Sequence, residues 1–96
     1  MPTPRLDADA IARHLSALPG WSLDGDSICK RFEFDDFVAA FGWMTQVAAE
    51  AERLAHHPDW RNVYNRVEVR LSTHDADGLT ELDFALAQFM ESAFVG

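Results

Sequence analysis

The sequence predicts an α+β fold: a four-stranded antiparallel sheet with three α-helices packed on one face, in the order α-β-β-α-β-β-α. Three observations predict it. Three segments repeat apolar residues at helical spacing, two segments between them each hold a pair of strand-like runs, and turn-forming residues separate the elements. The chain of 96 residues has no internal repeat or linker, so we expect a single domain over residues 1–96.

The first helix is expected to run from about Asp7 to Leu18. The Asp7 carboxylate can accept hydrogen bonds from the free amides of the first turn, which makes this residue a candidate N-cap. Pro19-Gly20 follows and stops the helix. The apolar face that this helix presents to the core contains Ile11, Leu15 and Leu18.

A β-hairpin is expected next, formed by residues 21–23 and 28–34. Asp24-Gly25 is a favourable turn pair between them, because glycine tolerates a positive φ. Alternate positions of the longer strand are apolar, which predicts one buried face. The residues on that face are Ile28, Phe32 and Phe34.

The second helix has the clearest helical pattern. Asp35 or Asp36 can cap its start. Pro58 cannot continue a helix and pushes the residue before it toward an extended conformation, so the helix is expected to end close to His56. Its predicted apolar face contains Phe37, Phe41, Met44, Val47, Ala48, Ala51 and Leu54.

Residues 62–73 are expected to contain the second strand pair, since Val67, Val69 and Leu71 alternate with polar residues. Tyr64-Asn65 is expected to mark a turn or a bulge before the longer strand. Gly78, in the loop that follows this strand, is expected to adopt an unusual backbone geometry.

The last helix is expected to begin at Thr80. Thr80 and Asp83 have the spacing of a capping box, with Asp in place of the usual Glu. Its apolar side chains are interpreted as core, although Phe89, Met90 and Phe94 could also form a surface for a protein partner. The apolar face contains Leu82, Leu86, Phe89, Met90 and Ala93.

Charge and composition exclude several classes of function. The formal net charge is −8, from 16 acidic and 8 scattered basic residues, which argues against direct nucleic-acid binding but leaves room for a local basic pocket. A single cysteine, Cys29, allows neither an internal disulfide nor a cysteine zinc site. The sequence has no signal-peptide pattern and no apolar run long enough for a membrane helix, so we expect a cytoplasmic protein without a membrane role.

Histidines at element ends are the strongest candidates for chemistry. His56, His57 and His74 can give and take protons near neutral pH. Glu52 lies four residues before His56, a spacing that places both side chains on one helix face, within reach of each other. The break at Pro58 is expected to turn His57 elsewhere, so that the two histidines can contact two sides of one ligand.

Each candidate also has a purely structural interpretation. Glu52 can be a solvated acid on a helix surface, and His56, His57 and His74 can be ordinary residues at element ends. Asp83 fits helix capping without any catalytic role. Trp60 and Tyr64 can be structural aromatics, and His14, alone on the first helix, is interpreted as structural or solvated.

A zinc site is the main chemical alternative, since three histidines and a water can complete a tetrahedral site. The sequence lacks the i, i+4 histidine pair of a helical zinc motif, and neighbouring His56 and His57 would have difficulty reaching one ion. We therefore predict no metal and no other cofactor.

The run from His56 to Val67, His-His-Pro-Asp-Trp-Arg-Asn-Val-Tyr-Asn-Arg-Val, forms a specific pattern with the later Leu71-Ser72-Thr73-His74 and Gly78-Leu79-Thr80. This pattern resembles the pterin-4a-carbinolamine dehydratase family. The close resemblance spans residues 52–83, and the order of helices and strands resembles the family over nearly the full length. One departure is Glu52-Arg53-Leu54-Ala55, where the commonest family form is Glu-Lys-Leu-Asn.

The resemblance implies removal of water from a 4a-hydroxytetrahydropterin to give quinonoid dihydropterin, a step in tetrahydropterin recycling. It implies that His56, His57 and His74 form the acid–base and pterin-contacting set. Glu52 and Asp83 are then supporting carboxylates, and Pro58 and Trp60 shape the site. The resemblance also implies a homodimer or homotetramer.

The chemistry needs an acid to protonate the leaving oxygen and a base to take the ring N–H proton. The sequence does not decide which histidine has which role. Two competing functions remain open: a coactivator-type module that binds a helical protein partner, and an inert homologue that binds a pterin without turning it over.

Overall fold

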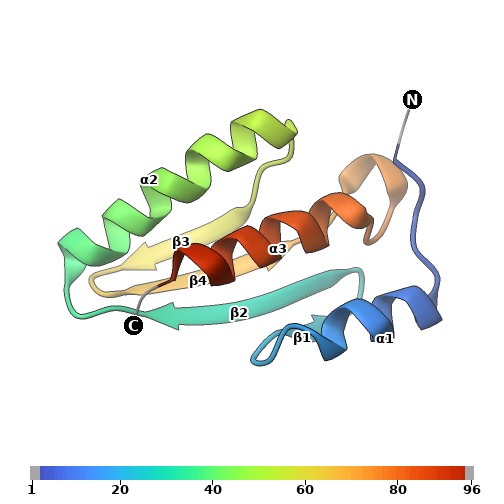
Figure 1. Cartoon of the computed structure of the whole chain (residues 1–96), viewed down its shortest axis with the longest axis horizontal. Helices are drawn as coiled ribbons and strands as arrows, with labels where there is room; N and C mark the ends of the chain where they lie inside the picture. The colour runs from blue at the N-terminus through green and yellow to red at the C-terminus, as the bar shows by residue number, and fades with distance from the viewer. Residues whose placement is uncertain (1–2, 95–96) are drawn as a thin grey trace.

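The computed structural model describes residues 3–94 and has the predicted fold (Figure 1). Its helices are α1 (Ala8–Ser16), α2 (Phe37–Leu54) and α3 (Glu81–Ala93), and a short 3-10 helix, η1, covers His74–Ala76. Its strands are β1 (Ser22–Asp24), β2 (Ser27–Glu33), β3 (Asp59–Val63) and β4 (Arg66–Leu71). The order α-β-β-α-β-β-α is therefore confirmed.

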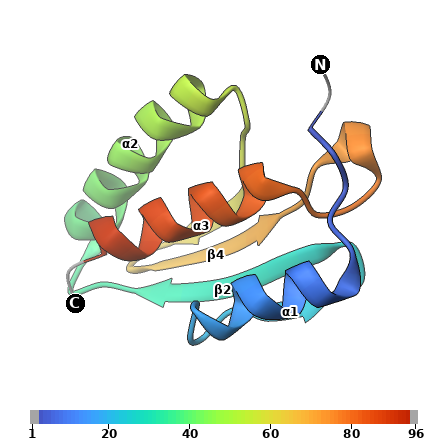
Figure 2. The same ribbon diagram turned by 45° about the vertical axis from the view of Figure 1, so that its right-hand side comes forward.

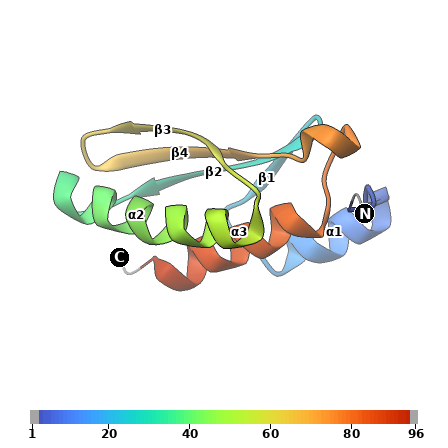
Figure 3. The same cartoon turned by 90° about the horizontal axis from the view of Figure 1, so that it is seen from above.

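The four strands form one sheet in the order β1-β2-β4-β3, and every neighbouring pair is antiparallel. Viewed from above, α1, α2 and α3 lie on one side of this sheet, and no α-helix of residues 3–94 lies on the other side (Figure 3). Turning the molecule shows α3 lying along the middle of the sheet, with α2 and α1 on either side (Figure 2). None of the helices in residues 3–94 is long and apolar enough to cross a membrane.

Helix starts follow the predicted capping residues. Asp7 accepts a hydrogen bond from the Ala10 amide at 2.9 Å, and Asp36 accepts one from the Ala39 amide at 2.8 Å. At the start of α3, Thr80 and Asp83 form a complete capping box. Each carboxylate also interacts favourably with the positive end of the dipole of its helix.

The predicted apolar face of α2 is partly wrong. Phe37, Phe41 and Ala48 are exposed, and Phe41 retains 54% of its accessible surface. The helix is apolar over a wider arc than the sheet and α3 cover, so the buried stripe lies to one side of the predicted one. That buried stripe contains Ala40, Trp43, Val47 and Ala51.

Three smaller differences concern element ends. Helix α1 ends at Ser16, two residues before the predicted Leu18, and β3 begins at Asp59, three residues before the predicted strand region. The positive φ in the loop after β4 belongs to Asp77, at 53°, and Gly78 has no positive φ. A Cβ at Gly78 would instead stand 2.8 Å from the exposed Arg5 side chain.

The core lies between the sheet and the helices. Met90 is fully buried on α3, and Phe89 and Phe94 pack against the core. This supports the interpretation of the last helix as core rather than as a free surface. The Trp43 indole donates a hydrogen bond to the Met90 carbonyl at 3.1 Å and joins α2 to α3.

Candidate active site

The end of α2 separates the two neighbouring histidines. Ala55 has left-handed backbone angles, φ 52° and ψ 41°, and the His56 amide donates back to the Ala51 carbonyl at 3.0 Å. This arrangement is a Schellman-type helix end. It turns the chain so that His56 is buried, with 8% exposure, while His57 remains exposed.

His56 pairs with Asp83 across 27 residues of sequence. The distance from His56 Nε2 to Asp83 Oδ1 is 2.6 Å, and Asp83 has no accessible surface. Because Asp83 belongs to the first turn of α3, this contact joins the end of α2 to the start of α3. The structural interpretation of Asp83 as a capping residue is therefore correct but incomplete.

The second carboxylate oxygen of Asp83 is also fully engaged. Oδ2 accepts from the Thr80 amide at 2.9 Å and from the Thr73 hydroxyl at 2.8 Å. Within the described residues, no buried side-chain nitrogen or oxygen lacks a hydrogen-bond partner. The buried carboxylate is thus compensated by donors on both oxygens, as burial of a charged group requires.

Glu52 pairs with His57, and not with His56 as its spacing predicted. Glu52 Oε2 contacts His57 Nε2, and the two side chains are 78% and 63% exposed. The i, i+4 rule holds only while the helix continues, and the left-handed Ala55 ends it one residue before His56. The site therefore contains two histidine–carboxylate pairs, one buried and one exposed.

His74 opens η1 and is exposed. It directly follows Thr73, whose hydroxyl contacts Asp83. His56, Asp83, Thr73 and His74 are thus connected in sequence or by hydrogen bonds. The end of α2, the start of α3 and η1 lie at the same end of the molecule (Figures 1 and 2).

Two of the remaining predicted residues lie after the histidines. Pro58 is half-buried between His57 and β3. Trp60 lies on β3, and its ring centroid is 6.1 Å from that of Trp43 on α2. Trp60 therefore packs against the core, as its structural interpretation expected. His14 pairs with Glu81 at 3.1 Å and stacks on the Phe84 ring.

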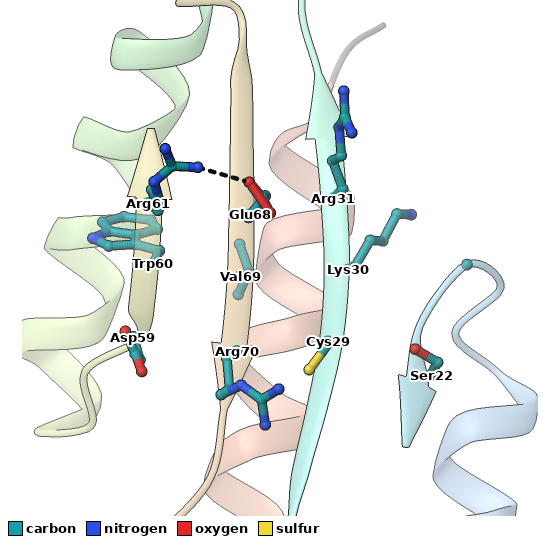
Figure 4. A pocket seen from close by; sticks show the side chains of 11 residues that line it. Ser22, Cys29, Lys30, Arg31, Asp59, Trp60, Arg61, Glu68, Val69 and Arg70 are labelled. Carbon is teal, nitrogen blue, oxygen red and sulfur yellow. Dashed lines mark hydrogen bonds and ion pairs between the residues drawn. The ribbon is translucent and has the colours of Figure 1, made fainter. Parts of the chain in front are cut away.

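A separate groove of about 430 Å³ lies over the outer face of the sheet, where the helices stand behind the strands (Figure 4). Of the predicted site residues, only Trp60 lines it. Four basic side chains line this groove, where the sequence left room for a basic pocket. Each of them forms an ion pair with a carboxylate. The pairs are Lys30–Glu91, Arg31–Glu33, Arg61–Glu68 and Arg70–Asp24.

Two ion pairs shift the pKa values of Arg70, Glu50 and Arg53. Arg70 donates a hydrogen bond to the Asp24 carboxylate, which raises the pKa of Arg70. On α2, the guanidinium of Arg53 donates to both oxygens of Glu50, which lowers the pKa of Glu50 and raises that of Arg53. Among residues 3–94, no group of three His, Cys, Asp or Glu side chains is placed to hold a metal ion.

Sequence reasoning missed the roles of two hydroxyl groups. Thr80 was expected only as a cap, and Thr73 was noted only within the Ser72-Thr73-His74 motif. Their Oγ1 atoms lie 2.8 Å apart, and the Thr73 hydroxyl donates to the carboxylate of the buried Asp83. No sequence spacing predicts this contact, since it depends on how the loop after β4 meets α3.

The site thus combines an α+β domain with a buried and an exposed histidine–carboxylate pair, a class of side-chain pair that can give and take protons. The comparisons with known proteins narrow this class. The sequence profile of the family described as pterin 4 alpha carbinolamine dehydratase matches residues 4–93. The chain therefore belongs to the pterin-4-alpha-carbinolamine dehydratase family.

Relatives support the assignment over nearly the whole chain. A protein of Rhizobium meliloti (strain 1021) named as a pterin-4-alpha-carbinolamine dehydratase is 61% identical over 96% of this chain and 90% of its own. A crystal structure described as transcriptional coactivator/pterin dehydratase from Brucella melitensis has a TM-score of 0.90 at 47% identity, covering 93% of this chain and 97% of its own.

A more distant structure shares the fold alone. It is described as a pterin dehydratase-like RuBisCO assembly factor of the alpha-carboxysome. Its TM-score is 0.63 at 19% identity, and the match covers 76% of this chain and 84% of its own. The fold therefore occurs in proteins whose described roles differ.

Proposed function

We propose that this chain is a hydro-lyase that converts 4a-hydroxytetrahydropterin to quinonoid dihydropterin and water, by histidine acid–base catalysis and as a single domain. The observation that carries the proposal is the buried pair of His56 and Asp83. A carboxylate that accepts from one ring nitrogen fixes the orientation of the imidazole and leaves the other nitrogen for a substrate.

The reaction requires two proton transfers. An acid protonates the hydroxyl oxygen as its bond to C4a breaks, and a base takes the ring N–H proton as the new double bond forms. His56 or His74 is proposed as the acid and another member of the histidine set as the base. Glu52 orients His57, Asp83 orients His56, and Pro58 and Trp60 shape the region around them.

The proposed pathway follows from this reaction. A dehydratase for this intermediate would return the pterin produced by hydroxylases to a reducible form, which is the recycling role that we propose. A cytoplasmic location remains a prediction. The test of the reaction is a stopped-flow measurement of quinonoid dihydropterin absorbance after freshly generated substrate meets the protein. A first-order rate that rises with protein concentration is expected, and a rate equal to that in buffer would contradict the proposal.

We also propose that the chain works as a homo-oligomer. Phe37, Val38 and Phe41 expose a contiguous apolar surface at the start of α2, where Val38 retains 77% of its surface. The Phe37 and Phe41 rings lie 5.6 Å apart and form one patch. Exposed patches of this kind are typical of protein interfaces. Sedimentation velocity of the parent and of Phe41→Glu tests this, since a monomeric parent would contradict it.

A further inference from the structure

The hydroxyl group of Thr73 is the part of the histidine region that helix capping does not explain. Thr73 lies between β4 and η1 and is buried, with 9% exposure. Its backbone is held by a bridge to Gly78, in which the Thr73 amide donates to the Gly78 carbonyl at 2.9 Å. Its side chain is therefore placed by the loop and points at Asp83.

Capping of α3 is complete without this residue. The capping box needs only the Thr80 side chain, the Asp83 side chain and the backbone amides that they accept from. Helices α1 and α2 begin with a single aspartate cap each. The additional donor from Thr73 at 2.8 Å is specific to the carboxylate that also contacts His56.

With Asp83 as a carboxylate, the number of protons on each group gives the direction of each hydrogen bond. A hydroxyl has one proton, and a carboxylate that faces several donors can only accept. Thr73 therefore donates to Asp83 Oδ2, and Thr80, 2.8 Å away, must donate to Thr73. The Leu82 amide then donates to the Thr80 hydroxyl at 3.2 Å. The chain of donors runs from the start of α3 through both threonines to Asp83.

These donors leave Asp83 as an acceptor toward His56. With Oδ2 occupied by the Thr73 hydroxyl and the Thr80 amide, Asp83 presents Oδ1 as an acceptor to His56 Nε2 at 2.6 Å. Nε2 must then carry a proton, so Nδ1 is the ring atom available to a substrate. Such second-layer donors orient the groups that touch a reactant.

We propose that Thr73 is a positioning residue for the dehydration: through Asp83, its hydroxyl holds His56 in the Nε2–H tautomer with Nδ1 free. The proposal rests on the proposed function. Thr73 also precedes His74, so the same residue fixes the buried histidine through its side chain and the exposed one through its backbone. Replacement of the hydroxyl is expected to lower kcat much more than it changes KM.

The first experiment compares Thr73→Val, which has nearly the same shape without the hydroxyl, with Thr73→Ser, which keeps the hydroxyl. Thr73→Val is expected to lower kcat by about tenfold or more, as when a hydrogen bond to a buried charged group is lost. Thr73→Ser is expected to retain most of the parent kcat. Thr45→Val is the matched control, since the Thr45 hydroxyl donates only to the Phe41 carbonyl on the exposed side of α2.

The second experiment measures the His56 tautomer from the ring ¹⁵N chemical shifts of the neutral imidazole, in the parent and in Thr73→Val. The Nε2–H form is expected in the parent, and a mixture of tautomers in the variant. A parent in the Nδ1–H form would overturn the proposal even if Thr73→Val failed to fold. A folded Thr73→Val with the parent kcat, or a Thr73→Ser as slow as Thr73→Val, would also overturn it.

The tautomer measurement also separates this proposal from the proposed function. If the parent has no dehydratase activity, the proposed function fails, and with it any role of Thr73 in the reaction. The ¹⁵N shifts would still decide whether the Thr73 hydroxyl fixes His56.

Discussion

His56 Nε2 lies 2.6 Å from Asp83 Oδ1, and both side chains are buried although 27 residues separate them in the sequence. The contact joins the end of α2 to the start of α3. It places a histidine next to a carboxylate that also caps a helix, so we expect stability and catalysis to depend on the same residue.

Asp83→Asn tests this dual role. An amide can accept through its oxygen alone, so either His56 or the pair of donors from Thr73 and Thr80 then faces an NH₂ group. We expect kcat to fall by about 10–100-fold, as for other residues that orient a reactive group. We also expect the free energy of unfolding to fall by about 1–3 kcal/mol.

The control for this variant is Asp36→Asn at the start of α2. Asn caps helices about as well as Asp, so a stability change within about 0.5 kcal/mol is expected. Kinetics and urea unfolding of both variants provide the comparison. An Asp83→Asn enzyme with parent kcat would show that the His56 contact is only structural.

The histidine set can be tested against a matched histidine outside it. His14 also pairs with a carboxylate, Glu81, at 3.1 Å. We expect His56→Gln, His57→Ala and His74→Ala each to lower kcat by about tenfold or more, because positioned acids and bases contribute ~10²–10⁴-fold. His14→Ala is expected to keep the parent kcat. Near-parent rates in all three variants, or an equal loss in His14→Ala, would contradict the assignment.

The left-handed Ala55 predicts a stabilising substitution. Left-handed backbone angles destabilise a non-glycine residue by about 1–2 kcal/mol. Replacement by glycine removes this strain, but glycine also makes the unfolded chain more flexible, which offsets part of the stabilisation. Ala55→Gly is therefore expected to raise the free energy of unfolding by ~0.5–1 kcal/mol.

Ala48→Gly, on the exposed face of the same helix, has the opposite expected sign and a cost of about 1 kcal/mol. Urea unfolding of both variants measures the difference. Destabilisation by Ala55→Gly would contradict the strained geometry. Ala55→Asn is expected to be tolerated for the same reason, since Asn tolerates left-handed angles better than Ala.

The Glu50–Arg53 pair predicts a pH dependence of stability. Arg53 lowers the pKa of Glu50 in the folded chain relative to the unfolded chain. The pair therefore stabilises the fold above the unfolded pKa, and this contribution disappears as the pH falls through the folded pKa. Arg53→Ala is expected to be less stable than the parent at neutral pH and equally stable in acid, as measured by unfolding at a series of pH values. A difference that persists below the pKa of Glu50 would contradict the electrostatic origin.

Local sequence patterns predicted most of the helices, strands and turns, because the ends of these elements depend on side chains that act on their own element. The caps at Asp7 and Asp36 and the capping box at Thr80 and Asp83 follow from side chains that reach their own helix. The turn at Tyr64-Asn65 lies between β3 and β4, as predicted. The exposed phenylalanines of α2 were misplaced, since periodicity cannot show how wide a stripe the sheet covers.

The site was predicted less completely than the fold. The expected Glu52–His56 pair failed because one left-handed residue, Ala55, ended the helix early. The actual partner of His56 is a tertiary contact, and so is the contact between Thr73 and Asp83. Such contacts depend on how α2, α3 and the loop after β4 pack together, which no spacing within one element contains.

The most direct test of the account is the dehydration rate of freshly generated 4a-hydroxytetrahydropterin after the protein has been treated with a metal chelator. We predict that the parent still accelerates the reaction well above buffer and that His56→Gln loses most of this acceleration. A rate equal to that in buffer for the chelated parent, or an unchanged rate for His56→Gln, would contradict metal-free histidine catalysis.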